Sequence, residues 1–299
     1  METNVGKAEQ RLCTRLKLGE EDSLHLIKAM REGRSSRSAV VLSPLAPADY
    51  KPPFACVDTS GWGWLPPRVF VPQEGEKPTS HADYGAGLYY SLDLSSCWES
   101  APLSVVPRPE SSLDMCAAPG GKSMLLAARY LPQCHVANEV NAARRGILRQ
   151  NMQQCGVPNV EVTGLRPDQW ATEGRQFDLL LADAPCSGQS LLCKGIRNPG
   201  CLGAQMVNGN AKRQKGILLA AVRCVAPGGH ILYSTCTYDP DENEKVMAYI
   251  LKRVPGWVAV EVPVLEAFRS TLAEFPCYRL LPRHGFGAGG FCCLLRKNT

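Results

Sequence analysis

Two cysteines in this chain stand where a thiol can do chemistry. Cys186 lies in the segment Asp183 to Gly188, directly after an apolar run, and Cys236 lies in the segment Thr235 to Tyr238, directly after another. A cysteine that serves only as a small buried side chain is expected within such a run, not after it. Thiolates are nucleophiles that can form covalent intermediates. The pattern therefore singles out Cys186 and Cys236 as reactive residues.

The other twelve of the fourteen cysteines are expected to be ordinary buried thiols. The chain is long enough to build its own core, and its first residues, Met1 to Asn4, lack the apolar stretch of a secretion signal, which disfavours a disulfide framework. No two cysteines have the CxxC spacing of a zinc site, and the five histidines do not cluster near the adjacent Cys292 and Cys293. The sequence thus predicts free thiols and no bound metal.

The two reactive cysteines follow two of five short apolar runs that indicate strands. From about residue 106 these runs alternate with helix-like stretches in the order β-α-β-α-β-β-α-β. This alternation predicts an α/β, Rossmann-like fold with a mostly parallel sheet and helices on both faces. Ligands bind such sheets at the carboxyl ends of the strands, where both cysteines would lie. The predicted strands are Ser112 to Met115, His135 to Ala137, Val160 to Thr163, Phe177 to Ala182 and His230 to Ser234, and the predicted helices are Lys122 to Tyr130, Asn141 to Cys155 and Lys212 to Val225.

The turn after the first predicted strand, Asp114 to Ser123, has small residues and two glycines, so its backbone can approach a ligand at the start of a helix. Its end imitates a phosphate-binding P-loop, but that motif requires glycine at Cys116, and the dinucleotide motif GxGxxG is absent as well. Glu139 follows the second strand, where an acid can bind the two hydroxyls of a ribose or can cap the next helix. Taken together, the turn and Glu139 indicate a nucleoside-bearing cofactor. The missing phosphate loop favours S-adenosylmethionine.

The residues before 106 have a different composition and predict a small accessory region. Residues 11–37 show the apolar rhythm of one or two amphipathic helices ending near Gly33, and residues 43–76 are rich in proline and glycine. Arg31, Arg34 and Arg37 can contact a phosphate backbone or form a solvated face, and the solvated face is favoured. No apolar run reaches the length of a membrane span. We therefore divide the chain into an accessory region, residues 1–105, which is expected to take part in binding the partner, and a second domain, residues 106–299, which is expected to bind the cofactor.

Residues 85–299 closely resemble the Nol/Nop/Sun family of RNA 5-methylcytosine methyltransferases. The joint order and spacing of several short segments carries this resemblance, and the presence of both cysteine segments is its most specific part. The matching segments are Gly87 to Tyr90 with Ser95 and Ser96, Asp114 to Lys122, Ala137 to Glu139 with Arg144, Asp183 to Gly188, Pro227 to Gly229, Tyr233 to Thr237, Glu242 to Glu244, Arg279 to Pro282, and Gly290 with Phe291.

The resemblance implies an enzyme with a Rossmann-like class I methyltransferase domain that transfers a methyl group from S-adenosylmethionine to C5 of cytosine in RNA. By this resemblance Cys236 is the nucleophile that adds to C6, and Cys186 is the base that helps to release the product. Asp183 is expected to hold the N3 and N4 edge of the cytosine, although it can also cap the following turn. The residues that the resemblance assigns to the cofactor are Cys116, Ala117, Ala118, Pro119, Gly120, Gly121, Lys122, Glu139, Arg144 and Asp183.

Three positions depart from the family pattern. Where the family has an acid after the third strand that contacts adenine, this chain has Arg166, with Asp168 two residues later as a substitute. Ser91 and Leu92 stand where members often carry glutamine, and Gln189 follows Gly188 where a second glycine is common. These departures bear on cofactor affinity and substrate choice, and they leave both thiols and Asp183 in place.

The charge pattern agrees with an RNA partner, for which rRNA or tRNA is expected. The segment from residue 184 to residue 238 contains no Asp or Glu but does contain Lys194, Arg197, Lys212, Arg213, Lys215 and Arg223. A positive rim of this kind attracts phosphates and favours the thiolate form of Cys236. The alternative from another class is an RNA-binding or assembly factor with a methyltransferase fold and little catalysis, and methylation of a protein or small molecule is a third hypothesis. We expect a monomer in the cytoplasm, with the nucleus and the mitochondrion left open.

Overall fold

The large sheet of the protein carries the predicted α/β architecture. The computed structural model describes residues 6–299, and its large sheet there has eight strands: β4 (Ser111–Asp114), β5 (Cys134–Asn138), β6 (Val160–Thr163), β7 (Phe177–Asp183), β8 (Val225–Thr235), β9 (Trp257–Ala259), β10 (Tyr278–Leu280) and β11 (Gly290–Lys297). The strand order is β10-β11-β8-β7-β4-β5-β6, with β9 paired to β11. Strands β4 to β8 are parallel to one another, which confirms the mostly parallel sheet.

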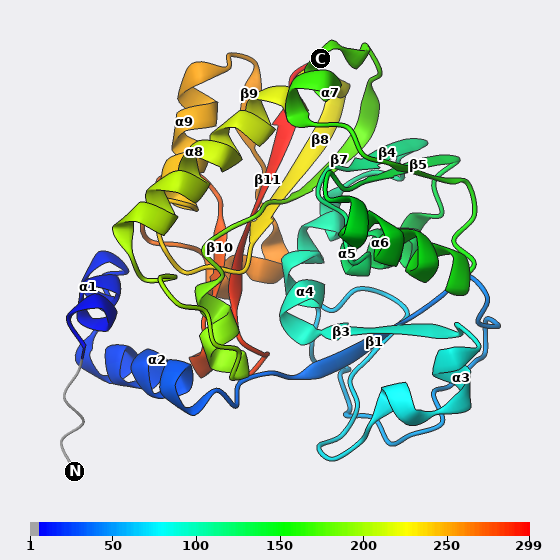
Figure 1. Ribbon diagram of the computed structural model, residues 1–299, viewed down its shortest axis with the longest axis horizontal. Helices are drawn as coiled ribbons and strands as arrows, with labels where there is room; N and C mark the ends of the chain where they lie inside the picture. The colour runs from blue at the N-terminus through cyan, green and yellow to red at the C-terminus, as the bar shows by residue number, and fades with distance from the viewer. Residues whose placement is uncertain (1–5) are drawn as a thin grey trace.

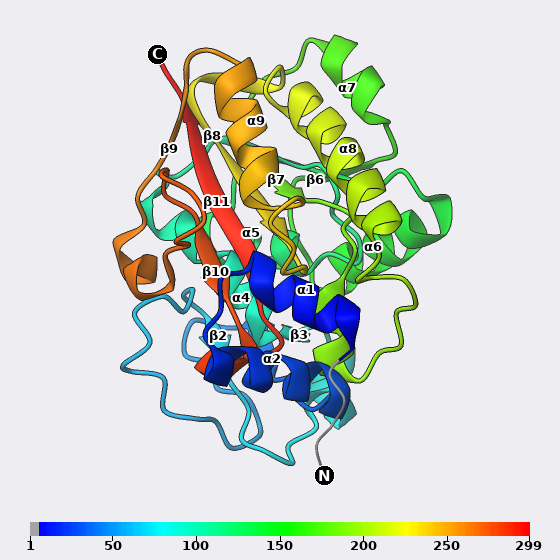
Figure 2. The same ribbon diagram turned by 90° about the vertical axis from the view of Figure 1, so that its left-hand side faces the viewer.

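Helices cover both faces of this sheet, as Figures 1 and 2 show. Strand β7 explains why, because it is apolar on both sides. Leu179 and Leu181 belong to the core formed with α5 and α6, whereas Leu180 and Ala182 belong to the core formed with α7, α8 and α9. The bounds of these helices are α5 Gly121–Tyr130, α6 Ala142–Gln154, α7 Pro167–Glu173, α8 Ala204–Ala221 and α9 Glu244–Arg253.

The chain reverses its direction of travel across the sheet at β4. From β4 it proceeds to β5 and β6 on one side, and then returns to β7 and β8 on the other. Such a switch point opens a crevice at the carboxyl ends of the strands, which is where open α/β sheets bind ligands. The carboxyl ends of β4, β7 and β8 all border this crevice.

The first part of the chain forms a small sheet and several helices. The small sheet has the antiparallel order β2-β1-β3. The elements in this part are α1 (Lys7–Arg15), α2 (Glu20–Glu32), β1 (Ser38–Leu42), β2 (Val69–Phe70), the 3-10 helix η1 (Pro78–Ser80), α3 (Ala82–Gly85), β3 (Tyr89–Asp93), α4 (Leu94–Glu99) and the 3-10 helix η2 (Ala101–Val105).

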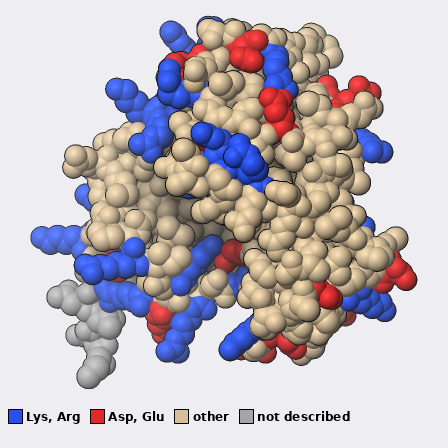
Figure 3. Space-filling view, turned by 45° about the vertical axis from the view of Figure 1, so that its right-hand side comes forward, with Lys and Arg blue, Asp and Glu red and all other residues tan. Residues whose placement is uncertain are grey.

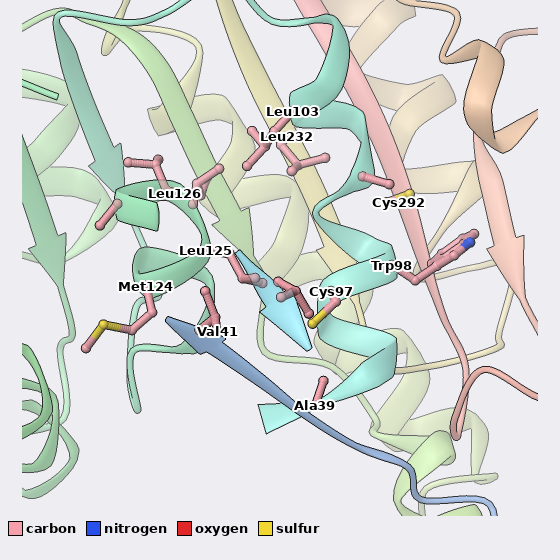
Figure 4. Close-up of a cluster of buried hydrophobic side chains, with 14 of the residues drawn as sticks. Ala39, Val41, Cys97, Trp98, Leu103, Met124, Leu125, Leu126, Leu232 and Cys292 are labelled. Atoms are coloured by element: carbon pink, nitrogen blue, oxygen red, sulfur yellow. The ribbon is translucent and has the colours of Figure 1, made fainter. Parts of the chain in front are cut away.

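One hydrophobic core joins this first part to the large sheet, as Figure 4 shows. Ala39 and Val41 of β1 and Cys97 of α4 lie in the same cluster as Leu125 of α5 and Leu232 of β8. Helices α1 and α2 form a second cluster, together with buried side chains from later segments, which include Cys193, Tyr238 and Leu281. The described part of the first 105 residues, residues 6–105, is thus anchored to the rest of the protein at two places.

The structure corrects the predicted elements in three places. A short helix, α7, separates β6 from β7, where two successive strands were expected. Helix α8 begins at Ala204, eight residues before the predicted start, because its first turns carry polar residues and a glycine that hide the apolar rhythm. The last strands, β9 to β11, were not anticipated at all, and β11 runs antiparallel to β8. The 3-10 helices of the later chain are η3 (Gln189–Lys194), η4 (Pro263–Phe268) and η5 (Pro282–His284).

Candidate active site

The two singled-out cysteines meet at the carboxyl ends of β7 and β8. The strands are paired in parallel up to Asp183 and Ser234, so the loops that follow them leave the sheet side by side. The Sγ atoms of Cys186 and Cys236 are 3.3 Å apart. Ser187 and Thr237 tie the two loops together through a 2.7 Å hydrogen bond between their hydroxyls. Both cysteines are only half-buried, so a substrate can reach them.

The two thiols have opposite electrostatic settings. The hydrogen bond from Cys186 lowers the pKa of Cys236, and the cations of Lys194 and Lys122 lower it further, against the effect of burial. The same hydrogen bond raises the pKa of Cys186 well above its usual value, and burial adds to this effect. When the pair loses one proton, the thiolate is therefore favoured on Cys236 and the remaining proton on Cys186. A thiolate is the nucleophilic form of a cysteine, so this arrangement makes Cys236 the candidate nucleophile of the pair.

Asp183 lies next to the cysteine pair and is held from two sides. Ser234 donates a 3.0 Å hydrogen bond to its Oδ1, and the ammonium of Lys122 lies 2.8 Å from its Oδ2. Lys122 also contacts Oε2 of Glu99 at 2.6 Å. Burial opposes the charge of Lys122, but the carboxylates of Asp183 and Glu99 outweigh it and raise the pKa of the ammonium.

A cavity of about 240 Å³ opens beside Asp183, at the switch point of the sheet. The turn that links β4 to α5 forms one wall, and the small sheet forms another. Gly120 in this turn has φ +121°, a conformation that favours glycine. The cavity is lined by Tyr90, Ser91, Leu92, Asp93, Ser96, Asp114, Cys116, Ala117, Ala118, Pro119, Gly121, Lys122, Asp183 and Lys194.

The residues of this cavity fit the methionine portion of S-adenosylmethionine. Gly120 caps α5 without a side-chain hydrogen bond, so the first N–H groups of the helix can bind a carboxylate. Asp114 and Asp183 offer acceptors for an ammonium group. Burial raises the pKa of Asp114 to about 7, and Ser123 donates a 2.8 Å hydrogen bond to it. The N–H donors and the carboxylate acceptors together therefore suit a zwitterionic amino-acid group.

The remaining predicted cofactor residues lie outside this cavity. Glu139 follows β5, accepts a hydrogen bond from the Asn141 N–H at 2.9 Å and contacts Arg144 at 3.2 Å. Arg144 also donates to the Ala118 carbonyl at 2.6 Å, which ties it to the turn. Glu139 thus shows the capping contact that its position allowed, and its other oxygen faces Arg144.

Arg166 and Asp168 are not brought to the cavity. The two side chains form an exposed ion pair with each other, at 3.0 Å, at the start of α7. Asp168 instead lines a separate groove of about 1100 Å³ between α7, α8 and the end of α9. Neither residue therefore stands beside Lys122 or Asp183 in this structure.

Sequence reasoning gave no individual role to Glu99, Asp93 or Ser234, and it named Lys194 only as one of the basic residues of the acid-free segment. Glu99, the last residue of α4, is buried beside Lys122. Lys194 of η3 lines the cavity and pairs with Asp93 at 3.2 Å. Ser234 had a signal, since it precedes Cys236 within the same motif. Glu99 had almost none, because a single acid in a short helix usually faces solvent.

The basic residues of the acid-free segment are spread over three places. Lys194 and Arg197 lie on η3 and the loop that follows it, next to the site. Lys212 and Lys215 line a small pocket on α8, and Arg213 and Arg223 line the groove near α7. Lys and Arg side chains gather around a hollow on the face drawn in Figure 3.

All fourteen cysteines are free thiols. Within residues 6–299, no group of three or more His, Cys, Asp or Glu side chains is arranged to hold a metal ion. No helix in that part of the chain is long and apolar enough to cross a membrane.

The strand order, the glycine turn at the switch point and the cavity beside it define a Rossmann-like domain of the methyltransferase class. Within this class, the chain belongs to the family described as 16S rRNA methyltransferase RsmB/F, whose model matches residues 104–296. The predicted membership of the Nol/Nop/Sun methyltransferases is thereby confirmed.

Two curated relatives are similar to this chain over part of their length. Ribosomal RNA small subunit methyltransferase F of Cronobacter sakazakii is 32% identical over 249 residues, which cover 79% of this chain and 51% of that protein. The tRNA (cytosine(49)-C(5))-methyltransferase of Pyrococcus abyssi is 35% identical over 178 residues, which cover 57% of each chain. The chain therefore spans about half the length of the curated relatives it matches.

Two solved structures from Pyrococcus horikoshii share the fold. A methyltransferase homologue superposes with a TM-score of 0.76 at 22% identity and covers 98% of this chain and 100% of its own. NSun6 superposes with a TM-score of 0.75 at 17% identity, with coverage of 99% and 98%. These similarities extend beyond the large sheet into the first 105 residues, because nearly the whole chain is covered.

Proposed function

We propose that this protein transfers a methyl group from S-adenosylmethionine to C5 of a cytosine in RNA, through a covalent adduct with Cys236. The observation that carries the proposal is the pair of sulfur atoms 3.3 Å apart, beside Asp183 and the cavity. Family membership and the names of the relatives support the reaction class. Cytosine C5 is a poor nucleophile, and a reaction of this kind needs a group that activates it.

Cys236 supplies this activation. The cytosine takes up a proton from solvent at N3, and the carboxylate of Asp183 accepts hydrogen bonds from N3–H and from the N4 amino group. The Cys236 thiolate then adds to C6, and the former C5=C6 electrons form a neutral enamine whose C5 is nucleophilic. S-adenosylmethionine supplies the electrophilic methyl group that C5 attacks.

Cys186 changes its role once the adduct exists. Its pKa is high in the free enzyme because it shares a proton with the Cys236 thiolate. When Cys236 becomes a thioether, this charge disappears, so Cys186 can lose its proton to solvent and act as a base. It then takes the proton from C5, the C5=C6 bond forms again, the C6–S bond breaks, and N3 returns its proton to solvent. Cys236 leaves as a thiolate, and the pair is ready for another cycle.

The substrate is proposed to be rRNA or tRNA, the classes named for the two curated relatives. We infer that one chain is sufficient for the chemistry, because Cys186, Cys236 and Asp183 all come from it. A reducing compartment such as the cytoplasm suits the requirement for two free thiols. Arg166 and Asp168 pair with each other away from the cavity, so neither supplies the adenine-contacting acid that the family pattern has after the third strand. This gives some weight to the alternative, a binding factor with little catalysis.

A single experiment tests the division of labour between the thiols. The protein is incubated with S-adenosylmethionine carrying a labelled methyl group and with unmodified rRNA and tRNA, and the label in 5-methylcytosine is measured. We expect wild-type incorporation and at least about a hundredfold loss in Cys236→Ala, since a covalent step is removed. Cys186→Ala is expected to trap a protein–RNA adduct that survives denaturing gels, because the C5 proton is no longer removed.

Cys134→Ala serves as the matched control, since this half-exposed thiol lies at the opposite end of the sheet. It should retain full activity and trap nothing. Adduct formation by Cys236→Ala instead would reverse the two roles. Binding of RNA without any incorporation by the wild type would favour the binding-factor alternative.

A further inference from the structure

We propose that Glu99 is a positioning residue for the methyl transfer, because its carboxylate holds the Lys122 ammonium and so preserves the negative charge with which Asp183 holds the cytosine. This inference rests on the proposed function and extends it to a residue from the first part of the chain. Glu99 itself does not line the cavity. It acts through Lys122.

The proposal rests on a row of three side chains in contact, which come from three elements. Lys122 of α5 lies between Glu99 of α4, at 2.6 Å, and Asp183 of β7, at 2.8 Å. The side chains of Glu99 and Lys122 are 3% and 7% exposed, whereas that of Asp183 is 38% exposed. Asp183 is therefore the most exposed of the three, while Lys122 also lines the cavity and Glu99 does not.

The residues packed around Glu99 leave space for its carboxylate beside Lys122. Gly290 lies against it, and a Cβ atom at that position would come within 2.0 Å of Glu99 Oε1. A side chain at residue 290 would therefore displace the carboxylate from Lys122. Strand β11 thus leaves space for a buried acid that α4 directs toward α5.

The net charge of Glu99, Lys122 and Asp183 together explains how Glu99 affects Asp183. Two carboxylates share one ammonium, so the three groups carry one net negative charge when Glu99 is ionised. Because Glu99 and Lys122 are buried, that charge is available at Asp183, which then accepts strongly from a protonated N3. If Glu99 is neutral, Lys122 offsets the charge of Asp183 and weakens this acceptor in a setting where solvent screens little.

The protonation state of Glu99 varies in the range where activity is measured. Burial raises the pKa of Glu99 to about 8, although Lys122 works against this shift. The charged and titratable groups that face it are Lys122 from α5, Asp183 from β7, Cys236 after β8, Cys97 within α4 and Cys292 from β11. The contribution of Glu99 to Asp183 should therefore grow as the pH rises through about 8.

The test compares wild type and Glu99→Gln across pH 6.5 to 9, with kcat and KM for methyl transfer to RNA measured at each pH. We expect nearly equal activity at the acid end and about a tenfold lower kcat for the variant at the alkaline end, because only ionised Glu99 strengthens Asp183. KM for RNA should change little, since the protonated N3 forms during the reaction and not on binding. Glu99→Asp, which keeps the charge, should recover much of the lost activity at high pH.

Asp178→Asn is the matched control. It removes a carboxylate from the other end of β7, where Asp178 accepts hydrogen bonds from Glu110 and Ser111, and it should not alter the pH profile. A constant ratio of wild type to Glu99→Gln at every pH, or a loss confined to KM, would overturn the role of Glu99. If Glu99→Gln does not fold, Glu99→Asp must show the wild-type pH profile with lower kcat, and a profile without the alkaline rise contradicts the proposal. An inactive wild type would instead disprove the proposed function.

Discussion

Two cysteines of ordinary chemistry become unlike each other because they share one proton. At 3.3 Å, the sulfur that holds the proton stabilises a thiolate on the other. Two nearby ammonium groups, those of Lys194 and Lys122, favour Cys236 as the anionic partner. The asymmetry of the pair thus comes from the charges around it: the Glu242 carboxylate raises the pKa of Cys186, and the two ammonium groups lower that of Cys236 against the effect of Asp183.

This asymmetry predicts how Cys236 reacts with a small electrophile. Alkylation by iodoacetamide requires the thiolate, so Cys236 should react at a lower pH than Cys56, whose pKa is raised by burial. In Cys186→Ala the hydrogen bond that lowers the pKa of Cys236 is lost. The rate profile of Cys236 should then move toward higher pH by about one unit. Peptide mass spectrometry after timed alkylation measures both residues in one sample.

Cys56 provides the internal control in that experiment, because it is half-exposed and lies in the first part of the chain. Its profile should be the same in wild type and in Cys186→Ala. An unchanged profile for Cys236 in the variant would mean that the cations alone set its pKa.

At the scale of elements, the sequence was most informative where a strand ends in a motif. The strands β4, β5, β6 and β7 were predicted within two residues of their observed bounds, because each is a short apolar run followed by polar or small residues. The same reasoning predicted that Cys186 and Cys236 lie at one edge of the sheet. What it could predict was the order of elements and the side of the sheet, which follow from local patterns.

Contacts between distant segments could not be predicted in the same way. Helix α7 has seven residues and one buried tryptophan, too short for a helical rhythm to show. Glu99 meets Lys122 only because α4 packs between β11 and α5, and nothing local to residue 99 signals this. Lys194 reaches the cavity because η3 turns back over the site. The unforeseen contacts are thus those that depend on tertiary packing.

The end of α2 illustrates such packing and yields a prediction. Gly33 ends this helix with φ +63°, and a Cβ atom there would lie 2.5 Å from Cα of Gly195, just after η3. Gly33→Ala should therefore destabilise the protein by about 1 to 3 kcal/mol, from backbone strain and from this contact. It should also lower methyl transfer, because η3 carries Lys194 into the cavity. Denaturant unfolding and initial rates measure the two effects.

Gly61→Ala is the matched control, since a Cβ atom there meets nothing within 4 Å. It should leave both stability and rate near the wild-type values. Equal stability of the two variants would show that η3 can move away from α2 without cost.

At the scale of the whole molecule, the distribution of charge indicates where RNA would bind better than the net charge does. The chain carries only +5, but the segment that brings both cysteines has no acid between residues 184 and 238. The fold divides the basic residues of that segment among the edge of the site, a small pocket on α8 and the groove near α7. Only those at the edge of the site should contact the phosphates on either side of a cytosine held by Asp183.

Arg197 and Arg223 allow this distinction to be measured. Arg197 is exposed on the loop after η3, and its neighbour Asn198 is hydrogen-bonded to the carbonyls of Ser187 and Gly188, beside Cys186. Arg223 is exposed in the turn just after α8. Arg197→Ala should weaken RNA binding and reduce the slope of log K against log salt by about one, the effect of losing one phosphate contact. Arg223→Ala should change neither, because RNA bound at the cysteine pair would not extend to the groove. Filter binding from low to moderate salt gives both slopes, and an equal loss in the two variants would mean that the RNA covers the groove as well.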